Sequence, residues 1–245
     1  MKNGRKCDKM KLLCRGGETG NRTGFKNLRA QALEGSSPSL GTIMLQKSLN
    51  PDKELQSYII GLALGDGNLS NPNKRAVRLR ISCDKNYPTL YKRIAESLQL
   101  LLPNNKVSII DRDLHCLDIS VYSNYLETLL GWRAKGGSKF IQNVSVPSWI
   151  KEAREYKISC LRGLIETDGS IYNDRGYKMM IFTSIIPELA NDFYNMIVSL
   201  GFQPYIYRIG KRKNSKYNFN QQPVYHVRLS KNVAEFLALV KPEKI

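Results

Sequence analysis

The chain has 245 residues, enough for one large domain or two small ones, and 42 % of them are hydrophobic. That composition permits a packed core and excludes a disordered or fibrous chain. The formal net charge is +17, which favours a polyanionic partner, above all nucleic acid, over a merely soluble basic protein. The sequence has no run of about 18 apolar residues and no signal-peptide stretch, which predicts an intracellular protein without a membrane partner.

Cysteine and histidine usage narrows the chemistry further. The five cysteines are odd in number and scattered, and no CxxC motif occurs. This pattern indicates reduced thiols rather than a disulfide framework. The only histidines are His115 and His226, which argues against a structural zinc site and against a nuclease built around several histidines.

Residues 1–43 differ from the rest of the chain. They carry nine basic and three acidic residues among Gly, Ser, Asn and Thr, with no persistent helix or strand period. This composition predicts a mobile basic leader. The leader could help to hold phosphates, or it could be an upstream extension that contributes nothing; the second interpretation is slightly favoured.

The next elements follow from hydrophobic periodicity. A helix opens at Pro51-Asp52 and ends at Gly65-Asp66-Gly67, where Gly67 is expected to be left-handed. The alternation around Val77, Leu79 and Ile81 predicts a hairpin. The predicted segments, in order, are a hairpin over 68–84, a helix over 88–101, two strands within 106–122 with a turn at 111–113, and a short helix over 123–130.

After a glycine-rich connector at 131–147 the same order returns. The predicted segments are a helix over 157–167, a hairpin over 170–184 that turns at 173–176, a helix over 187–200, strands at 204–209 and 223–229, and a last helix over 230–240. The predicted domains are therefore a leader at 1–43, a first half at 44–130, a linker at 131–147 and a second half at 148–245.

An internal repeat links the two halves. IIGLALGDGNLS at 59–70 matches LRGLIETDGSIY at 161–172, and SLQLLLP at 97–103 is similar to SLGFQP at 199–204. Two copies of one unit in one chain predict a pseudo-dimer of α+β class, each copy with the order αββαββα.

The repeated helices carry small residues four apart. They are Gly61 and Gly65 in the first copy and Gly163 and Thr167 in the second, and Ser57 and Ser159 extend each small face by one turn. Small residues at this spacing let two helix backbones approach closely. A pseudo-two-fold axis would then bring together Asp66 and Asp168, the residues at which the helices end.

Two carboxylates held together repel one another unless a positive group lies between them. The motif cores contain no basic residue except Arg162, so a divalent cation is the expected neutraliser. Oxygen ligands favour Mg²⁺, Mn²⁺ or Ca²⁺, and the carbonyls of Gly65 and Thr167 could also ligate. Asp-Gly after a helix is also a common turn, so each copy alone carries little weight.

The two strings resemble the paired motif of LAGLIDADG homing endonucleases in their single-chain, two-motif form. IIGLALGDG at 59–67 and LRGLIETDG at 161–169 are the two copies, and VPSWI at 146–150 is also similar to that family. The resemblance covers residues 50–240. It implies two αββαββα repeats whose four-stranded antiparallel sheets form a saddle for double-stranded DNA.

The resemblance also implies site residues. Asp66 and Asp168 would be the catalytic metal ligands, with the carbonyls of Gly65 and Thr167 beside them. The cofactor would be Mg²⁺, with Mn²⁺ able to substitute and Ca²⁺ able to bind without supporting cleavage. The first copy departs from the motif at Leu64, whereas Glu166 keeps the acidic residue. The family keeps basic and polar residues around the metal pocket, and the candidates are Arg80, Gln142, Arg228 and Lys231.

A sheet laid in the major groove presents every second side chain to the bases. Arg78 and Arg80 are expected to face outward, whereas the strand at 177–182 is apolar on both faces and leaves its orientation open. The loop at 210–222 interleaves four basic residues with Tyr217 and Phe219, which favours contacts to phosphates and bases over a merely solvated loop. The predicted DNA-binding residues are Lys74, Arg75, Arg78, Arg80, Lys139, Lys178, Arg208, Lys211, Arg212, Lys213, Lys216, Arg228 and Lys231.

The expected function is that of a monomeric, intron-encoded, site-specific endonuclease that cuts both strands of a long asymmetric target. Two alternatives stay open. One is an RNA maturase of the same fold whose partner is its host intron RNA. The other is a non-catalytic DNA-binding regulator, for which a further DNA-binding domain would be expected.

Overall fold

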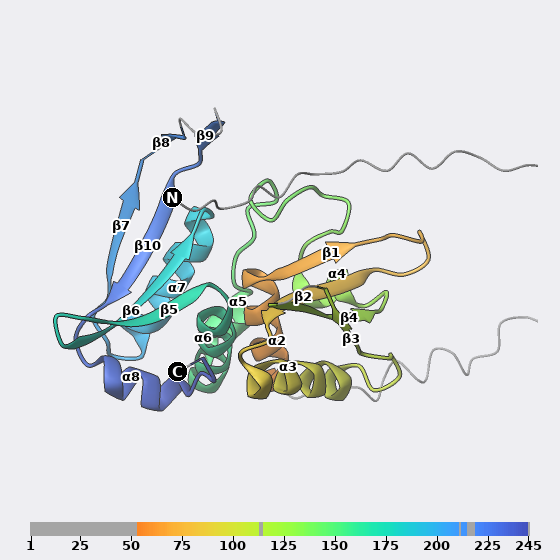
Figure 1. The fold of residues 1–245 in the computed structure, drawn as a ribbon, viewed down its shortest axis with the longest axis horizontal. Coiled ribbons are helices and arrows are strands. Elements are labelled where there is room, and N and C mark those ends of the chain that lie inside the picture. The colour runs from red at the N-terminus through yellow and green to blue at the C-terminus, as the bar shows by residue number, and fades with distance from the viewer. Residues whose placement is uncertain (1–52, 113–114, 211, 215–218, 245) are drawn as a thin grey trace, which may run out of the picture. The chain divides into compact units, whose positions relative to one another are not determined.

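The computed structural model describes residues 53–112, 115–210, 212–214 and 219–244 (Figure 1). The leader, the Pro51-Asp52 helix start and Asp113 lie outside these ranges. Within the part of the chain that the structure describes, no helix is long and apolar enough to cross a membrane.

The first half has the predicted order of elements. They are α2 (Lys53–Gly65), β1 (Gly67–Ser70), β2 (Arg78–Asp84), α3 (Pro88–Leu101), β3 (Ser108–Asp111), β4 (Cys116–Tyr122) and α4 (Leu126–Leu130). The four strands form one antiparallel sheet in the order β1-β2-β4-β3. Helix α4 is shorter than predicted, and it ends where Gly131 adopts φ 82°, a conformation that costs glycine little.

The second half repeats this plan. Its elements are α5 (Ser148–Glu152), α6 (Arg154–Asp168), β5 (Gly169–Asp174), β6 (Tyr177–Ser184), α7 (Pro187–Ser199), β7 (Tyr205–Ile209), β8 (Arg212–Asn214), β9 (Phe219–Gln221), β10 (Val224–Leu229) and α8 (Val233–Val240). The main sheet has the order β5-β6-β10-β7 and is again antiparallel. The pseudo-dimeric α+β fold predicted from the repeat is confirmed.

Three local expectations need correction. The loop at 210–222 contains a two-stranded hairpin, β8–β9, and α5 precedes α6, which itself starts three residues earlier than predicted. Gly67 is not left-handed. Its requirement for glycine is steric, because a Cβ there would lie 2.5 Å from the Ala63 carbonyl oxygen.

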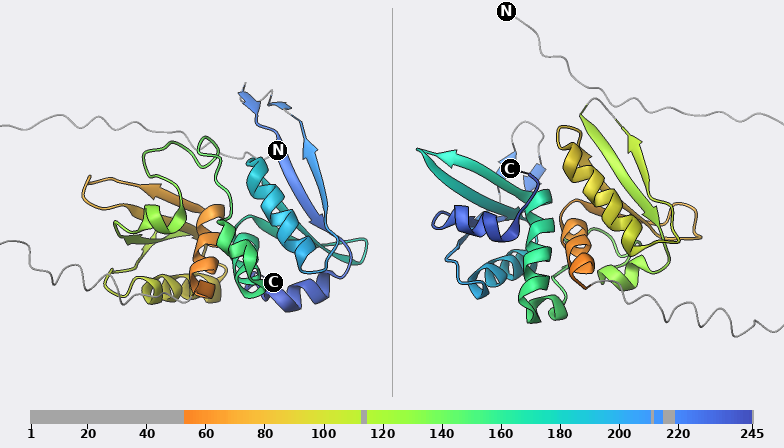
Figure 2. Two further views of the ribbon diagram at one scale, coloured as in Figure 1. Left: turned by 180° about the vertical axis from the view of Figure 1, so that it is seen from behind. Right: turned by 90° about the horizontal axis from the view of Figure 1, so that it is seen from below.

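Helices α2 and α6 lie side by side at the centre, with one sheet on each side of the pair (Figures 1 and 2). Every residue of α2 from Ser57 to Leu64 is buried, as expected for a helix that is apolar on all sides. Each sheet buries one face against helices. In the first sheet this face carries Leu79, Ile81 and Ile119, which are fully buried.

The orientation of the second sheet, which the sequence left open, is settled by burial. Met180 and Phe182 are fully buried and face the helices, whereas Ile181, paired with Arg228, faces the other side. We call the sides of the two sheets that face away from the helices the open faces. The site lies where these two sheets meet the ends of α2 and α6.

Candidate active site between the two halves

The helix pair is as close as the small residues predicted. A Cβ on Gly61 would clash with the backbone carbonyl of Cys160, and a Cβ on Gly163 would lie 2.5 Å from the Tyr58 carbonyl oxygen. A methyl group has no room at either position, since real Cβ contacts are longer. The two glycines therefore set the separation of the helices, and with it the separation of whatever their ends carry.

The last contact of the pair joins Gly65 to Thr167. A Cβ on Gly65 would clash with the Thr167 side chain, whose hydroxyl donates to the Gly163 carbonyl at 2.9 Å and to the Leu164 carbonyl at 3.1 Å. Among the four small residues at 61, 65, 163 and 167, Thr167 is the one that is not a glycine, and its hydroxyl is hydrogen-bonded within its own helix.

Asp66 follows α2 directly and Asp168 is the last residue of α6, so one carboxylate from each half arrives at the same end of the pair. Burial and, to a lesser extent, the negative charge of Asp66 together raise the pKa of Asp168 to about 6, although Lys139 and Lys244 act to lower it. Burial also raises the pKa of Asp66, a more exposed side chain, while Lys139 and Lys244 act to lower it. The effect of the Asp66 charge on the pKa of Asp168 indicates that the two carboxylates lie close together.

Lys139 supplies positive charge to the carboxylate pair, because its charge lowers the pKa values of both aspartates. Its ammonium group donates to the carbonyls of Ala63 at 3.2 Å and Leu64 at 2.7 Å, and also to that of Gly65. Burial lowers the pKa of Lys139, and the charges of Asp168 and Asp66 oppose that shift. A cation at the C-terminal end of a helix is favourable because the unpaired carbonyls there carry partial negative charge.

Lys244 plays the corresponding part for α6. Its ammonium group donates to the carbonyl of Thr167 at 3.3 Å and lies 3.5 Å from that of Gly169. The sequence-based reasoning missed Lys244 because it lies beyond the last predicted helix, 76 residues from Asp168. The expectation that a divalent cation neutralises the carboxylates was therefore incomplete, because the charges of two lysines from outside the motifs act on both aspartates.

Two cavities flank the carboxylate pair and are related by the repeat. The first, of about 240 Å³, contains Asp66, Thr167 and Lys244, and we call it the Asp66 cavity. The second, of about 420 Å³, contains Asp168, Gly65 and Lys139, and we call it the Asp168 cavity. Each cavity therefore pairs an aspartate from one half with a lysine that caps the motif helix of the other half.

The donors at the carboxylate pair fit a hard divalent cation. They are oxygens only: the carboxylates of Asp66 and Asp168, and the helix-end carbonyls of Gly65 and Thr167. The described residues contain no cluster of three or more His, Cys, Asp and Glu that could hold a metal. Cys83, in the Asp66 cavity, is no competitor, because burial raises the pKa of its thiol to about 12.

The other predicted pocket residues lie elsewhere. Gln142 organises the linker: its side chain accepts from the Arg133 backbone N–H at 2.9 Å and donates to the Arg133 and Gly137 carbonyls at 2.9 and 3.0 Å. Arg80 and Arg228 lie on the open faces, each with a buried Nε that has no hydrogen-bond partner in the structure. Lys231 is exposed between β10 and α8. None of the four contacts the carboxylate pair.

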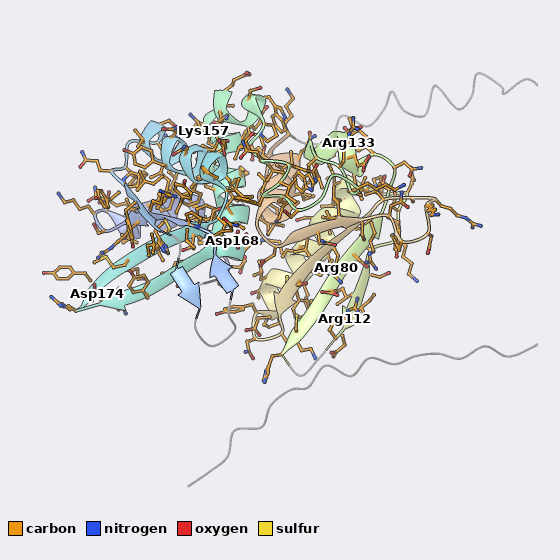
Figure 3. All side chains as sticks on the ribbon, turned by 90° about the horizontal axis from the view of Figure 1, so that it is seen from above. Arg80, Arg112, Arg133, Lys157, Asp168 and Asp174 are labelled. Carbon is orange, nitrogen blue, oxygen red and sulfur yellow. The ribbon has the colours of Figure 1, made fainter. Side chains whose placement is uncertain are left out.

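The open face of the first sheet is charged and hydrogen-bonded. Asp118 accepts from Ser82 at 2.7 Å and from Arg112 Nε at 2.6 Å, and Arg80 lies 3.8 Å from it. Burial acts to raise the pKa of Asp118, but these hydrogen bonds and positive charges outweigh it and lower the pKa. Figure 3 shows Arg80 and Arg112 over this sheet. Arg78 faces the same side and donates to Ser70 at 3.2 Å.

The open face of the second sheet is aromatic instead. Tyr205 stacks on Tyr207 with ring centroids 5.8 Å apart, and Tyr207 stacks on His226 at 5.2 Å. His226 in turn bonds to Thr183 at 3.0 Å. Arg228 belongs to this face and lies 3.8 Å from Asp174, which Figure 3 shows at the tip of the β5–β6 hairpin.

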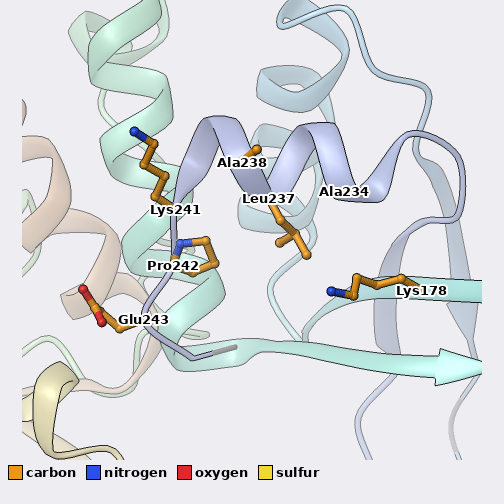
Figure 4. Close-up of a pocket in the computed structure, with 7 residues that line it drawn as sticks. All are labelled: Lys178, Ala234, Leu237, Ala238, Lys241, Pro242 and Glu243. Carbon is orange, nitrogen blue, oxygen red and sulfur yellow. The ribbon is translucent and has the colours of Figure 1, made fainter.

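Several predicted DNA-binding residues are separated by this geometry. The strand register places the Lys178 side chain on the face of the second sheet that the helices cover, where it lines a surface pocket beside α8 (Figure 4). Arg208 lies on the same face of that sheet. Lys74 and Arg75 are exposed in the turn between β1 and β2. Lys211 and Lys216 lie outside the described residues; Arg212 and Lys213 lie in β8, where the structure describes only the backbone.

Comparison with known proteins agrees with this architecture. Residues 155–241 match the LAGLIDADG-like domain. The homing endonuclease I-DmoI superposes with a TM-score of 0.54 at 17 % identity, over 77 % of this chain and 95 % of that one. Full-length DUF199/WhiA from Thermatoga maritima superposes with a TM-score of 0.53 at 14 % identity, over 80 % of this chain and 58 % of that one.

A curated relative in sequence is the ATP-dependent DNA helicase Hel308 of Thermococcus kodakarensis, 24 % identical over 182 residues. The match covers 70 % of this chain but only 15 % of the helicase, so it concerns a small part of that protein. The second half of the chain therefore matches the LAGLIDADG-like domain, and the first half repeats its order of helices and strands.

Proposed function

We propose that the chain is a site-specific endonuclease that hydrolyses both strands of double-stranded DNA with a divalent cation held by Asp66 and Asp168. The observation that carries this proposal is the meeting of one aspartate from each half at the adjoining ends of α2 and α6. Supporting it are solved complexes of I-DmoI with DNA and Mg, Mn or Ca. The basic excess of the chain fits a phosphate backbone as its partner.

Each residue has a distinct task in such a site. Asp66 and Asp168 would hold the cation between the halves, and their carboxylates must be ionised to do so. When bound, a divalent cation stabilises charge on the scissile phosphate and lowers the pKa of water. Lys139 and Lys244 bring positive charge to the two cavities, where an ammonium group can donate to phosphate oxygens.

The two open faces support a long and asymmetric target. One face presents Arg78 and an Arg–Asp–Ser network, and the other presents Tyr205, Tyr207 and His226. Because polar and aromatic side chains contact different base edges, the two halves of the target should differ in sequence. Arg228 on the second open face and Lys139 in the Asp168 cavity remain proposed DNA contacts. Lys178 and Arg208 lie on the helix side of their sheet and are not proposed as base contacts.

Binding without cleavage is the second candidate, and one observation favours it. The ammonium groups of Lys139 and Lys244 already occupy the carbonyls of Gly65 and Thr167, which the motif resemblance assigns to the metal. Internal cations of this kind would let the fold tolerate its two carboxylates without any metal. RNA binding by a maturase is a third outcome that the same experiment would reveal.

The test is cleavage of a randomised duplex library in Mg²⁺ by the wild type and by Asp168→Asn in parallel. We expect the wild type to cut one long motif and the variant to cut none. Salt-sensitive duplex binding without cutting by the wild type would favour the non-catalytic alternative. Binding of structured RNA in preference to duplex DNA, again without cutting, would favour the maturase.

A further inference from the structure

A buried ionic cluster lies beside the carboxylate pair, centred on Glu166. The Glu166 side chain is completely buried. Its carboxylate accepts from the Tyr58 hydroxyl at 2.7 Å and forms an ion pair with Arg93. Tyr58 and Arg93 belong to α2 and α3 of the first half, so Glu166 ties the second motif helix to the opposite half.

The same cluster fixes the segment that follows α8. Glu166 accepts a hydrogen bond from the backbone N–H of Glu243 at 2.8 Å. Arg93 also pairs with the Glu243 carboxylate at 2.8 Å. Glu243 is therefore held through both its main chain and its side chain, and Pro242 before it is buried. Figure 4 shows how Pro242 and Glu243 follow α8.

The next residue is Lys244, whose ammonium group reaches the end of α6 and lines the Asp66 cavity. A lysine side chain loses much rotamer freedom when it is ordered. Anchoring the preceding residue at two points lowers that cost, because the backbone of Lys244 is already in place. The cluster thus orders the backbone at residues 242–244 and holds the Lys244 ammonium group at the end of α6.

The other half lacks this device. At the position of Glu166 the first motif has Leu64, which is buried and apolar. Lys139 is placed instead by the linker, and its ammonium group bonds to three successive carbonyls of α2. The first motif, which has Leu64 in place of the acidic residue, therefore receives its lysine from the linker instead of from a segment held by an ionic cluster.

We propose that residues 242–244 are a working part of the nuclease site. In this proposal, Lys244 supplies the positive charge of the Asp66 cavity to a phosphate of the bound strand. Glu166, Arg93 and Glu243 are positioning residues that act through Lys244. The proposal rests on the proposed function, because it assigns a task within DNA cleavage.

The experiment is a double-mutant cycle on the full chain, with single-turnover cleavage of each target strand measured in Mg²⁺. The variants are Lys244→Met, Glu243→Ala and the two combined, with Lys244→Arg to restore the charge. Lys241→Met is the matched control, because it removes the same charge from an exposed side chain at the end of α8. Thermal unfolding of each variant is followed in parallel.

We expect Lys244→Met to slow cleavage by at least about tenfold, a smaller loss than the roughly hundred- to thousandfold typical of removing one preorganised donor from an active site. Glu243→Ala should slow it by about three- to tenfold, and should add nothing in the Lys244→Met background, because a positioning residue has no effect once its target is gone. Lys244→Arg should recover part of the rate, and Lys241→Met should stay within about twofold of the wild type.

Wild-type cleavage that Lys244→Met leaves unchanged would overturn this inference alone. Independent, additive losses in the double variant would also overturn it, by showing that Glu243 acts through stability or another group. A wild type that binds its duplex but never cuts it would instead refute the proposed function, and the assignment of Lys244 with it.

Discussion

The Asp66 and Asp168 cavities are built on one plan and lined by different residues. The Asp66 cavity contains Ser82, Asp84 and Tyr87 and has a volume of about 240 Å³. The Asp168 cavity contains Phe140, Ile185 and other apolar side chains and is larger, at about 420 Å³. The aspartate, the lysine and the helix end recur in both. What the repeat preserves is the charge arrangement at the helix ends, while the walls have diverged.

This difference indicates which features the chemistry constrains. The carboxylate and ammonium positions follow from two helix ends that cannot separate, because Gly61 and Gly163 leave no space between them. The walls carry no such constraint and can adapt to two different DNA strands. If each cavity acts on a different strand, substitutions in the two cavities should affect the two strands differently, and both cavities should be required for a double-strand cut.

The largest expected effect is loss of cleavage on removing either carboxylate. Asp66→Asn and Asp168→Asn should each abolish cutting of both strands while duplex affinity stays largely intact, since both aspartates would share the cation. The measurement is gel-resolved cleavage alongside binding in Ca²⁺. Cutting of one strand by either variant would show that each cavity holds its own cation independently.

The same variants should have the opposite effect on stability. The pKa of Asp168 is raised to about 6, so the folded state binds a proton more tightly than the unfolded state does. The ionised carboxylate then destabilises the fold, by at most about 3 kcal/mol above pH 6 and not at all below about pH 4. Asp168→Asn should therefore raise the melting temperature at pH 7 and leave it nearly unchanged at pH 3.5.

Removing Lys139 should have the next largest effect. Lys139→Met leaves the α2 carbonyls without their cation and withdraws the charge that lowers the pKa values of both aspartates. We expect cleavage to fall by about ten- to a hundredfold, with the strand in the Asp168 cavity more affected than the strand in the Asp66 cavity. Equal losses on both strands would mean that the lysines serve the carboxylate pair as a whole.

Cleavage should also depend on pH through Asp168. In the metal-free protein this carboxylate loses its charge as the pH falls through about 6, so protons should compete with the cation below that pH and the Mg²⁺ concentration that gives half of the maximal single-turnover rate should rise. Because the charge of Asp66 contributes to the raised pKa, the Asp66→Asn variant should lower the pKa of Asp168. Carbon-detected NMR of the carboxyl group would measure it, and an unchanged pKa would show that the two groups do not interact.

A smaller effect, on stability alone, is expected from the helix interface. Gly163→Ala adds a Cβ that would lie 2.5 Å from the Tyr58 carbonyl oxygen. Overpacking of this kind costs about 1–3 kcal/mol, which exceeds the gain of about 1 kcal/mol from alanine's helix propensity. Gly210→Ala is the control, because its Cβ would meet nothing within 4 Å. Denaturant unfolding would compare the two, and a stable Gly163→Ala variant would contradict the tight pairing.

Much of the fold was readable from the sequence because its signals are local. The Asp-Gly strings fixed the repeat, Pro88 and Pro187 marked helix starts that the structure confirms, and the alternation at 77–81 gave the correct inward face. The small residues at 61, 65, 163 and 167 predicted the helix contact because close packing leaves few substitutes for glycine.

The features that the sequence did not predict depend on contacts between residues that are far apart in the chain, which local sequence patterns do not reveal. Lys244 lies next to Glu243, which forms an ion pair with Arg93, a residue 151 positions before Lys244. The orientation of the strand at 177–182 depended on which side the helices cover, since both of its faces are apolar. Lys178 and Arg208 were assigned to DNA by charge, and the sheet register turns them to the helix side.

The smallest expected effect comes from removing residues 1–43. The leader carries nine basic and three acidic residues, that is +6 of the +17 total, whereas the cavities and both open faces lie after residue 53. Deletion should leave the melting temperature unchanged and lower duplex affinity only modestly, with a shallower salt dependence because fewer phosphates are neutralised. Affinity and unfolding measured across a salt series would decide this. A large loss of stability would place the leader within the fold, and a loss of cleavage at unchanged affinity would extend the site beyond the two halves compared above.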